Sequence, residues 1–290
     1  MIERKNPRCA NIAFFSVVHG VYFNQFEGLE ASLNSYHAET IRLVEENGVT
    51  VFDYGFIDSN TKAFEVAERI NADKIDVIFC NMITYATSSV FAPIVQLTKA
   101  PIVLVALQPR KGLDYSKAST FMQLENDNIC SVPEFTGVAI RFGRPVQDVV
   151  IGTLYDDPQA QKELAQWCDI AKVLHDLKGA RIGLMGHVLE SMYDMHADPT
   201  AVSAAFGVHV PLLEIDDVLD VYATVTEEEI QAKIAMIDAE FDMPEPESDP
   251  VAMKLTDADK YQAAKSAVAL DKFVEKHHLT GLAYYYEGQA

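Results

Sequence analysis

Short apolar runs alternate with amphipathic stretches along the first half of the chain. The runs are nearly continuous in Val, Ile, Leu and Phe, and they predict four strands over residues 11–18, 49–57, 75–83 and 101–107. Strands this apolar are typically covered by helices on both faces, which favours a parallel sheet. Right-handed crossovers through the intervening helices make such a sheet doubly wound.

Cap and stop signals mark the helices between these strands. A predicted helix over residues 27–47 ends at Asn47-Gly48, a typical C-terminal stop. Ser59 is a preferred N-cap residue and begins a second helix, which runs to Asn71. A third helix is predicted over residues 88–98.

The pattern is less regular over residues 108–144 and returns to strand character at residues 147–154. Asp157-Pro158 then opens another helix. Lys178-Gly179 ends this region and separates it from a second alternation of apolar and amphipathic segments.

The second alternation contains three predicted strands with helices between them. The strands cover residues 180–186, 208–215 and 280–286, and the helices lie near 198–206, 226–240 and 257–277. We therefore predict an α/β chain of two consecutive doubly wound parallel-sheet domains of the Rossmann or flavodoxin-like type, residues 1–178 and 179–290.

The charge balance narrows the range of partners. With 43 acidic and 23 basic residues the formal net charge is −20, which repels nucleic-acid phosphates and anionic membranes. No targeting segment is recognised, and no apolar run reaches the length of a membrane span. The four cysteines are widely spaced and include no CxxC pair. We therefore expect a cytoplasmic protein with neither a nucleic-acid nor a membrane partner.

Polar side chains follow several predicted strands, at the edge where open α/β folds place ligands. They are His19 to Tyr22, Asn81, Thr84, Tyr85, Gln108, Gly186-His187 and Glu287. No GxGxxG loop follows the first strand, and the GxxxxGKS/T and GxSxG motifs are absent. Dinucleotide binding, phosphoryl transfer and serine-hydrolase chemistry are therefore disfavoured.

Five acidic and histidine side chains lie close together after the strand at 180–186. They are His187, Glu190, Asp194, His196 and Asp198. Imidazole and carboxylate together suit a divalent transition metal. The structural alternative is a solvated loop in which Asp198-Pro199 begins a helix, and we favour this alternative.

Glu287 follows three consecutive tyrosines at the end of a predicted interior strand. An apolar setting raises the pKa of a carboxyl group and suits it to act as a base or as a metal ligand. A strand-terminal glutamate can equally cap a neighbouring helix. The residues alone leave both interpretations open.

The order of segments resembles that of the L-arabinose isomerase family. The likeness covers nearly the whole chain and is carried by SVVHGVYF, FMQLENDNICSVPEFTGVAIRF, QDVVIGTLYDDPQAQKELAQW, ARIGLMGHVLESM, FGVHVPLLEIDDVLDVYATVTEEEI and LDKFVEKHHLTGLAYYYEG. The resemblance implies aldose–ketose isomerisation of a pentose or hexose, such as L-arabinose, through an enediol. It also implies manganese or another divalent cation as cofactor. Glu287 matches the family's first catalytic glutamate, which is both a base and a metal ligand.

The resemblance assigns sugar contacts to further residues. His19 and Tyr22 match a loop beside the sugar, with one residue inserted between them. Asn126 or Asp127 falls where a glutamine reaches the sugar in a neighbouring subunit. Leu189 lies where a methionine contacts the substrate.

The chain departs from the family in two respects. Cys130 or Ile129 stands where the family has a histidine, which leaves the identity of the sugar open. Family members also continue further, with a second catalytic glutamate, two metal-ligating histidines and a C-terminal domain. We therefore expect the domain at residues 179–290 to be truncated and the 290-residue chain alone to be inactive.

The family is oligomeric, with active sites at subunit boundaries, so the resemblance implies a homo-oligomer. A second class of function stays open: a non-catalytic cytoplasmic module that binds sugar or oligomerises. A continuation of the reading frame with another glutamate and two histidines would distinguish the enzyme from the module.

Overall fold

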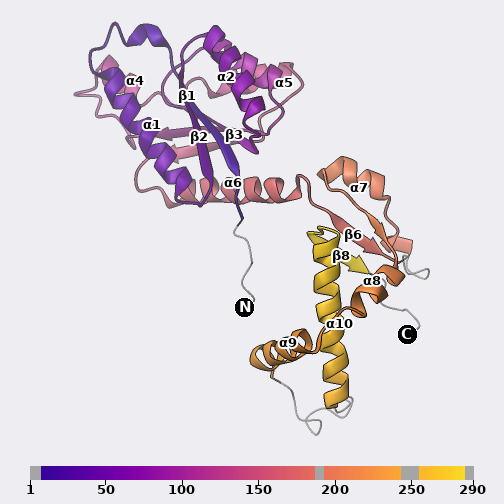
Figure 1. Ribbon diagram of the computed structural model, residues 1–290. Coiled ribbons are helices and arrows are strands. Elements are labelled where there is room, and N and C mark those ends of the chain that lie inside the picture. The colour runs from indigo at the N-terminus through magenta and orange to yellow at the C-terminus, as the bar shows by residue number, and fades with distance from the viewer. Residues whose placement is uncertain (1–7, 187–192, 243–254, 285–290) are drawn as a thin grey trace. The chain divides into compact units, whose positions relative to one another are not determined.

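The computed structural model describes residues 8–186, 193–242 and 255–284. Contacts divide the chain into two compact units, Met1–Asp176 and Leu177–Ala290, called unit 1 and unit 2 below (Figure 1). No helix of the described residues is long and apolar enough to cross a membrane.

Unit 1 is built on a five-stranded parallel sheet in the order β2-β1-β3-β4-β5. The strands are β1 (Asn11–Val17), β2 (Thr50–Ile57), β3 (Val77–Met82), β4 (Ile102–Gln108) and β5 (Asp148–Thr153). This is the strand order of flavodoxin-like folds. The predicted α/β class and parallel sheet are confirmed.

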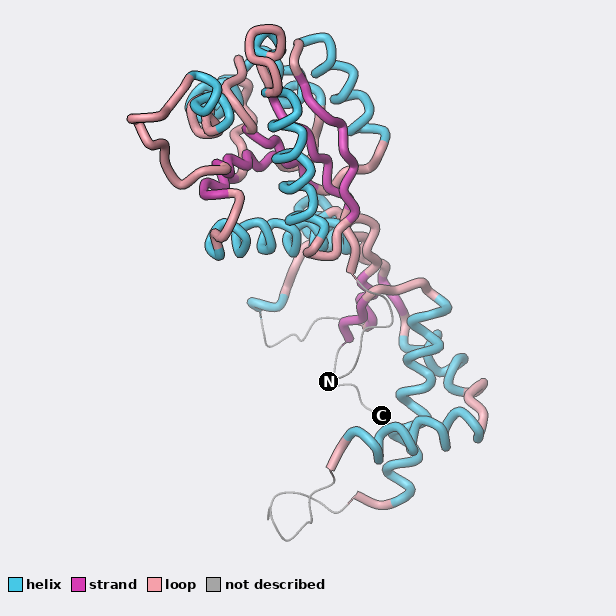
Figure 2. Tube along the Cα trace, turned by 90° about the vertical axis from the view of Figure 1, so that its left-hand side faces the viewer, coloured by secondary structure: helices cyan, strands magenta, loops and turns pink. Residues whose placement is uncertain are grey.

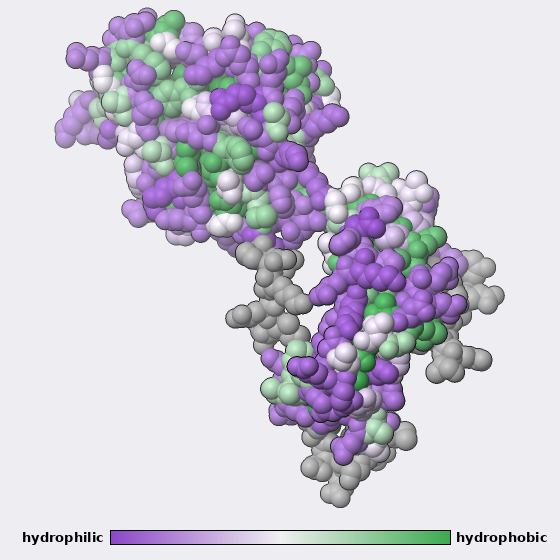
Figure 3. Space-filling view, viewed as in Figure 1, coloured by the Kyte–Doolittle hydropathy of each residue, from purple (hydrophilic) through white to green (hydrophobic). Residues whose placement is uncertain are grey.

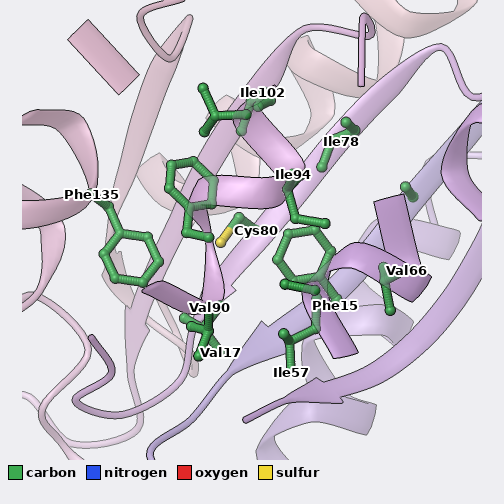
Figure 4. Close-up of a cluster of buried hydrophobic side chains, with 14 of the residues drawn as sticks. Phe15, Val17, Ile57, Val66, Ile78, Cys80, Val90, Ile94, Ile102 and Phe135 are labelled. Atoms are coloured by element: carbon green, nitrogen blue, oxygen red, sulfur yellow. The ribbon is translucent and has the colours of Figure 1, made fainter. Parts of the chain in front are cut away.

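Helices cover both faces of this sheet (Figure 2). They are α1 (Leu29–Glu45), α2 (Asn60–Ala72), α3 (Ala92–Leu97), α4 (Thr120–Glu125), α5 (Val132–Arg141) and α6 (Pro158–Leu177), with short 3₁₀ turns η1 (Gly20–Tyr22) and η2 (Ser88–Val90). Side chains of α1 and α6 pack on one face around Phe14 and Phe79. Side chains of α2, α3 and α5 pack on the other face, around Phe15 and Ile78 (Figure 4).

The two cores follow from the alternation of side chains along a strand. Phe14 and Phe15 are neighbours in β1, point to opposite faces, and are both 0% exposed. Every residue of β3 is buried. The continuous apolar runs in the sequence therefore reflect strands with a core on each side.

Local capping residues mark the starts of several helices in unit 1. The side chain of Ser59 accepts a hydrogen bond from the Lys62 N–H at 3.4 Å, as expected of an N-cap. Asp157 precedes α6 and accepts from the N–H groups of Thr153, at 2.9 Å, and Ala160, at 3.1 Å. The turn from β5 into α6 is thereby fixed.

Two predictions for unit 1 need correction. The segment 108–144 is not irregular, because it contains α4 and α5. Ser119 caps α4 by accepting from the Met122 N–H, and Pro133 stands in the first turn of α5. The helix predicted at 88–98 is η2 followed by the six-residue α3.

Unit 2 has a smaller parallel sheet in the order β7-β6-β8. Its elements are β6 (Ile182–Met185), η3 (Tyr193–Met195), α7 (Pro199–Phe206), β7 (Leu212–Leu213), α8 (Ile215–Tyr222), α9 (Glu227–Glu240), α10 (Asp257–Lys276) and β8 (Gly281–Tyr284). Its buried cluster contains Met185, Leu213, Val221, Phe273 and Leu279.

The strand predicted at residues 208–215 is shorter in the structure. β7 has two residues, preceded by Pro211, which has no N–H to donate to a neighbouring strand. The sequence then turns helical at Ile215 and forms α8, which was not predicted. Hydrophilic residues cover much of the visible surface of both units, as the acidic composition requires (Figure 3).

Candidate functional site

The carboxyl ends of β1 and β3 form the topological switch point of unit 1. The two strands are neighbours, but the helices that follow them cover opposite faces of the sheet. Val44 of α1 packs on the face of Phe14, and Ile94 of α3 packs on the face of Phe15. The connections diverge there, which is the position at which open α/β folds bind ligands.

Three aromatic side chains meet at this point. The chain leaves β1 through His19 and enters the η1 turn, which ends at Tyr22. The His19 and Tyr22 rings are edge-to-face, with centroids 5.1 Å apart. Tyr85, which follows β3, lies edge-to-face with His19 at 6.3 Å. All three side chains are partly buried.

Two further polar side chains come from the loop between α4 and α5. Asp127 and Cys130 both interact electrostatically with Tyr22, whose pKa is raised by burial and then by Tyr85, Asp127 and Cys130. His19, Tyr22, Tyr85, Asp127 and Cys130 are called the edge cluster below.

The acidic and thiol groups of the edge cluster are hydrogen-bonded to each other. Desolvation raises the pKa of Asp127, and the hydrogen bond from the Cys130 thiol opposes that rise. Desolvation and the nearby Asp127 carboxylate raise the pKa of the Cys130 thiol. At neutral pH the thiol therefore stays protonated and donates, while Asp127 accepts.

Asn126 makes structural hydrogen bonds within unit 1. It is 8% exposed. Its carbonyl oxygen accepts from Gln108 Nε2 at 2.7 Å, and its Oδ1 accepts from the Arg110 N–H at 2.9 Å. Of the two alternatives Asn126 and Asp127, the structure places Asp127 with Tyr22.

Other side chains named for the strand edge also have structural partners. Thr84 Oγ1 donates to the Leu124 carbonyl at 2.7 Å. Asn81 Nδ2 donates to Ser16 Oγ at 2.9 Å, inside the core. Both are buried and fix the connections from which the edge cluster projects.

Ser16 belongs to a buried chain of hydrogen bonds that the sequence does not reveal. Its Oγ lies 2.7 Å from His37 Nδ1, and His37 Nε2 lies 3.0 Å from Asp53 Oδ1. The Ser16 hydroxyl accepts from Asn81 Nδ2, and His37 Nε2 donates to the Asp53 carboxylate, which can only accept. Ser16 and His37 are buried, so their bond joins α1 to the sheet, and the chain of hydrogen bonds ends at the exposed side chain of Asp53.

Two of the residues predicted for the site, Glu287 and Leu189, lie outside the described residues. His187 and Glu190 lie there as well. Asp198 accepts from the Thr200 N–H at 2.7 Å and caps α7, in agreement with its structural interpretation.

Among the described residues, no group of three or more His, Cys, Asp or Glu side chains is placed to hold a metal ion. The predicted manganese site depends on Glu287. It therefore stays a prediction.

Comparison with known proteins gives a distant relationship. No family model matches the chain. It is 23% identical over 194 residues to an L-arabinose isomerase of Aeromonas hydrophila subsp. hydrophila, and 22% identical over 194 residues to one of Aeromonas salmonicida. Each match covers 67% of this chain and 38% of the relative, so the chain spans less than half the length of these relatives.

Among solved structures, a putative two-component response regulator/GGDEF domain protein superposes with a TM-score of 0.29 at 9% identity, over 95% of this chain and 92% of that one. A likeness this low carries no argument. The chain is thus a distant relative of L-arabinose isomerases, with an α/β fold.

Proposed function

We propose that this chain is the sugar-binding part of an aldose–ketose isomerase, and that the edge cluster of unit 1 holds the sugar. The observation that carries the proposal is the convergence of His19, Tyr22 and Asp127 at the switch point of a doubly wound sheet. The distant similarity to L-arabinose isomerases supports it independently.

The chemistry of the edge cluster suits a neutral polyhydroxyl ligand. The Asp127 carboxylate accepts from sugar hydroxyls, while Tyr22 and Tyr85 donate to sugar oxygens. Aromatic rings offer apolar surface to the C–H groups of a sugar. The raised pKa of Tyr22 keeps its phenol a donor throughout the physiological range. A net charge of −20 disfavours phosphorylated ligands.

The isomerisation itself needs groups beyond unit 1. A carboxylate must move a proton between adjacent carbons of the sugar, and we propose Glu287 for that role. A divalent ion such as manganese, when bound, would hold the sugar oxygens and polarise the carbonyl. We further propose a cytoplasmic homo-oligomer with active sites at subunit boundaries.

A non-catalytic sugar-binding module is the second candidate. One observation favours it: the edge cluster is complete within unit 1 and requires no contribution from Glu287. Both candidates predict sugar binding, and they differ only in turnover.

Calorimetric titration of the 290-residue chain with aldopentoses and aldohexoses tests the proposal. We expect binding of at least one neutral aldose. Asp127→Asn should weaken this binding about tenfold or more, because hydrogen bonds to a charged group contribute about 1.5–3 kcal/mol. Asp114→Asn, in an exposed loop, is the matched control. Tighter binding of sugar phosphates or nucleotides than of neutral sugars would contradict the proposal.

A further inference from the structure

A buried carboxylate lies beside the edge cluster. Glu125, the last residue of α4, is 4% exposed. The Tyr36 hydroxyl donates to its Oε1 at 3.1 Å, and the Arg110 guanidinium donates to its Oε2 at 3.1 Å. Removing a carboxylate from water costs several kcal/mol unless partners of this kind compensate.

These bonds join three separate elements. Tyr36 belongs to α1, and Arg110 lies two residues beyond β4. Glu125 ties both of them to the end of α4, and the chain reaches Asp127 two residues later.

The loop after Glu125 is also bonded along the end of β4. Besides the two bonds accepted by Asn126, Asn128 Nδ2 donates to the Leu107 carbonyl at 3.0 Å. Both asparagines are buried. The side chain between them, Asp127, is the one that faces the edge cluster.

We propose that Glu125 is the positioning residue of the edge cluster: its paired carboxylate holds residues 125–128 against the end of β4, so that Asp127 faces Tyr22 and Cys130. Glu125 itself contacts no ligand. Its effect on sugar binding rests on the proposed function, whereas its effect on the position of Asp127 does not.

A glutamine cannot reproduce the pairing of Glu125. Its amide places an oxygen and an NH2 group where the carboxylate has two oxygens, so Tyr36 and Arg110 cannot both donate at their present positions, and the bond from Arg110 loses its charge assistance. Burial and the Glu125 carboxylate raise the pKa of Tyr36 to about 12, which keeps its hydroxyl a donor. The expected result of Glu125→Gln is a loop that is no longer held at this point.

The Cys130 thiol provides a readout that needs no ligand. Cys9 and Cys130 are exposed, whereas Cys80 and Cys168 are buried. In a Cys9→Ser background the rate of alkylation by iodoacetamide, measured against pH, therefore reports the titration of Cys130. The Asp127 carboxylate raises that pKa, so the profile senses where the carboxylate lies.

We expect Asp127→Asn to speed alkylation at pH 7 about threefold to tenfold, because it removes the carboxylate that raises the pKa of the thiol. Glu125→Gln should shift the profile in the same direction, and Tyr36→Phe should shift it less. Adding Glu125→Gln to Asp127→Asn should produce no further shift, because Glu125 acts through Asp127. Glu163→Gln on α6 is the matched control and should leave the profile unchanged.

If Glu125→Gln has the same pH profile of alkylation as the parent, the proposal is wrong. It is also wrong if Glu125→Gln shifts the profile further when it is added to Asp127→Asn. If Glu125→Gln does not fold, Tyr36→Phe decides, since it removes one hydroxyl donor. Faster alkylation of Tyr36→Phe supports the proposal, and an unchanged profile overturns it.

Titration with L-arabinose separates this inference from the proposed function. Absence of sugar binding in the parent contradicts the function, while the thiol profile still decides the role of Glu125.

Discussion

Unit 1 and unit 2 each contain a parallel sheet, but the sheet of unit 2 has fewer strands and is more exposed. In unit 1 every residue of β3 is buried, and separate cores lie on the two faces of the sheet. In unit 2 the short strands β7 and β8 expose Leu212 at 71% and Tyr284 at 59%. Unit 1 therefore has a core large enough to hold a preorganised site, whereas the described residues of unit 2 form one small cluster around Phe273.

The largest effects are expected from removing one core phenylalanine from each unit. Phe14→Ala should cost unit 1 about 3–5 kcal/mol and leave it folded, whereas the same loss at Phe273 should unfold unit 2. The single tryptophan, Trp167, lies in unit 1. Its fluorescence during urea unfolding therefore reports unit 1, while far-ultraviolet circular dichroism reports both units. A fluorescence midpoint that moves with Phe273→Ala would show that the units are not independent.

A second comparison separates the catalytic role proposed for Glu287 from sugar binding at the edge cluster. Under the proposed function, Glu287→Gln in an intact longer protein should lower turnover roughly a hundredfold or more, because a general base is lost. Sugar affinity at the edge cluster should stay unchanged. Glu275→Gln, an exposed position on α10, is the matched control. Turnover near the parent rate in Glu287→Gln would remove this residue from the mechanism.

Glycines in the two sheets should respond differently to an added methyl group. At Gly152 of β5 a Cβ would lie 2.5 Å from Asp157 Oδ2 and 2.8 Å from Ala160 Cβ, both held by the α6 cap. Gly152→Ala should therefore cost about 1–3 kcal/mol.

At Gly183 of β6 the nearest atoms are the flexible ends of Leu213 and Leu279, at 2.6 and 2.8 Å. These ends can move aside, so Gly183→Ala should cost less. Gly112→Ala, with no atom near the added Cβ, is the control. Equal losses at Gly152 and Gly183, measured by urea unfolding, would contradict the comparison.

The smallest expected effects concern the stability of the two units at low pH. Hydrogen bonds from Lys272 and then Thr226 lower the pKa of Glu229 in unit 2 to about 2. The folded state therefore holds this proton more weakly than the unfolded state, and the stabilisation is lost as pH falls from about 4.5 toward 2. The pKa of Asp127 in unit 1 is raised instead, so its contribution to stability decreases as pH rises past the ordinary value of 3.8.

Unfolding measured between pH 5 and pH 2 checks this contrast. Glu229→Gln should flatten the pH dependence of unit 2. If Glu229→Gln loses stability with falling pH as steeply as the parent does, the hydrogen bonds of Glu229 do not account for that pH dependence.

The central strands of unit 1 were predictable because they are nearly continuous apolar runs: the run at 11–18 became Asn11–Val17. The helices α4 and α5 were not, because they are short and depend on distant bonds such as that of Ser131 with Ala86. β7 was over-predicted because its pairing is interrupted at Pro211: His209 forms only an isolated bridge with Arg181, and the chain turns helical at Ile215.

The residues of the candidate site were also predictable only in part. His19 and Tyr22 follow directly from the end of the first strand, and Asp127 from the resemblance. The role of Glu125 was not predictable, because its partner Tyr36 is 89 residues away in the sequence. The fold brings them together through contacts that no local pattern encodes.

The central claim is that the edge cluster of unit 1 is a sugar site, and titration of L-arabinose into the isotope-labelled chain, followed by amide NMR, tests it most directly. The account predicts saturable shifts at residues 19–22, 85 and 127–130, lost in Asp127→Asn but kept in Asp114→Asn. Shifts confined to unit 2, or shifts that Asp127→Asn leaves intact, would contradict it.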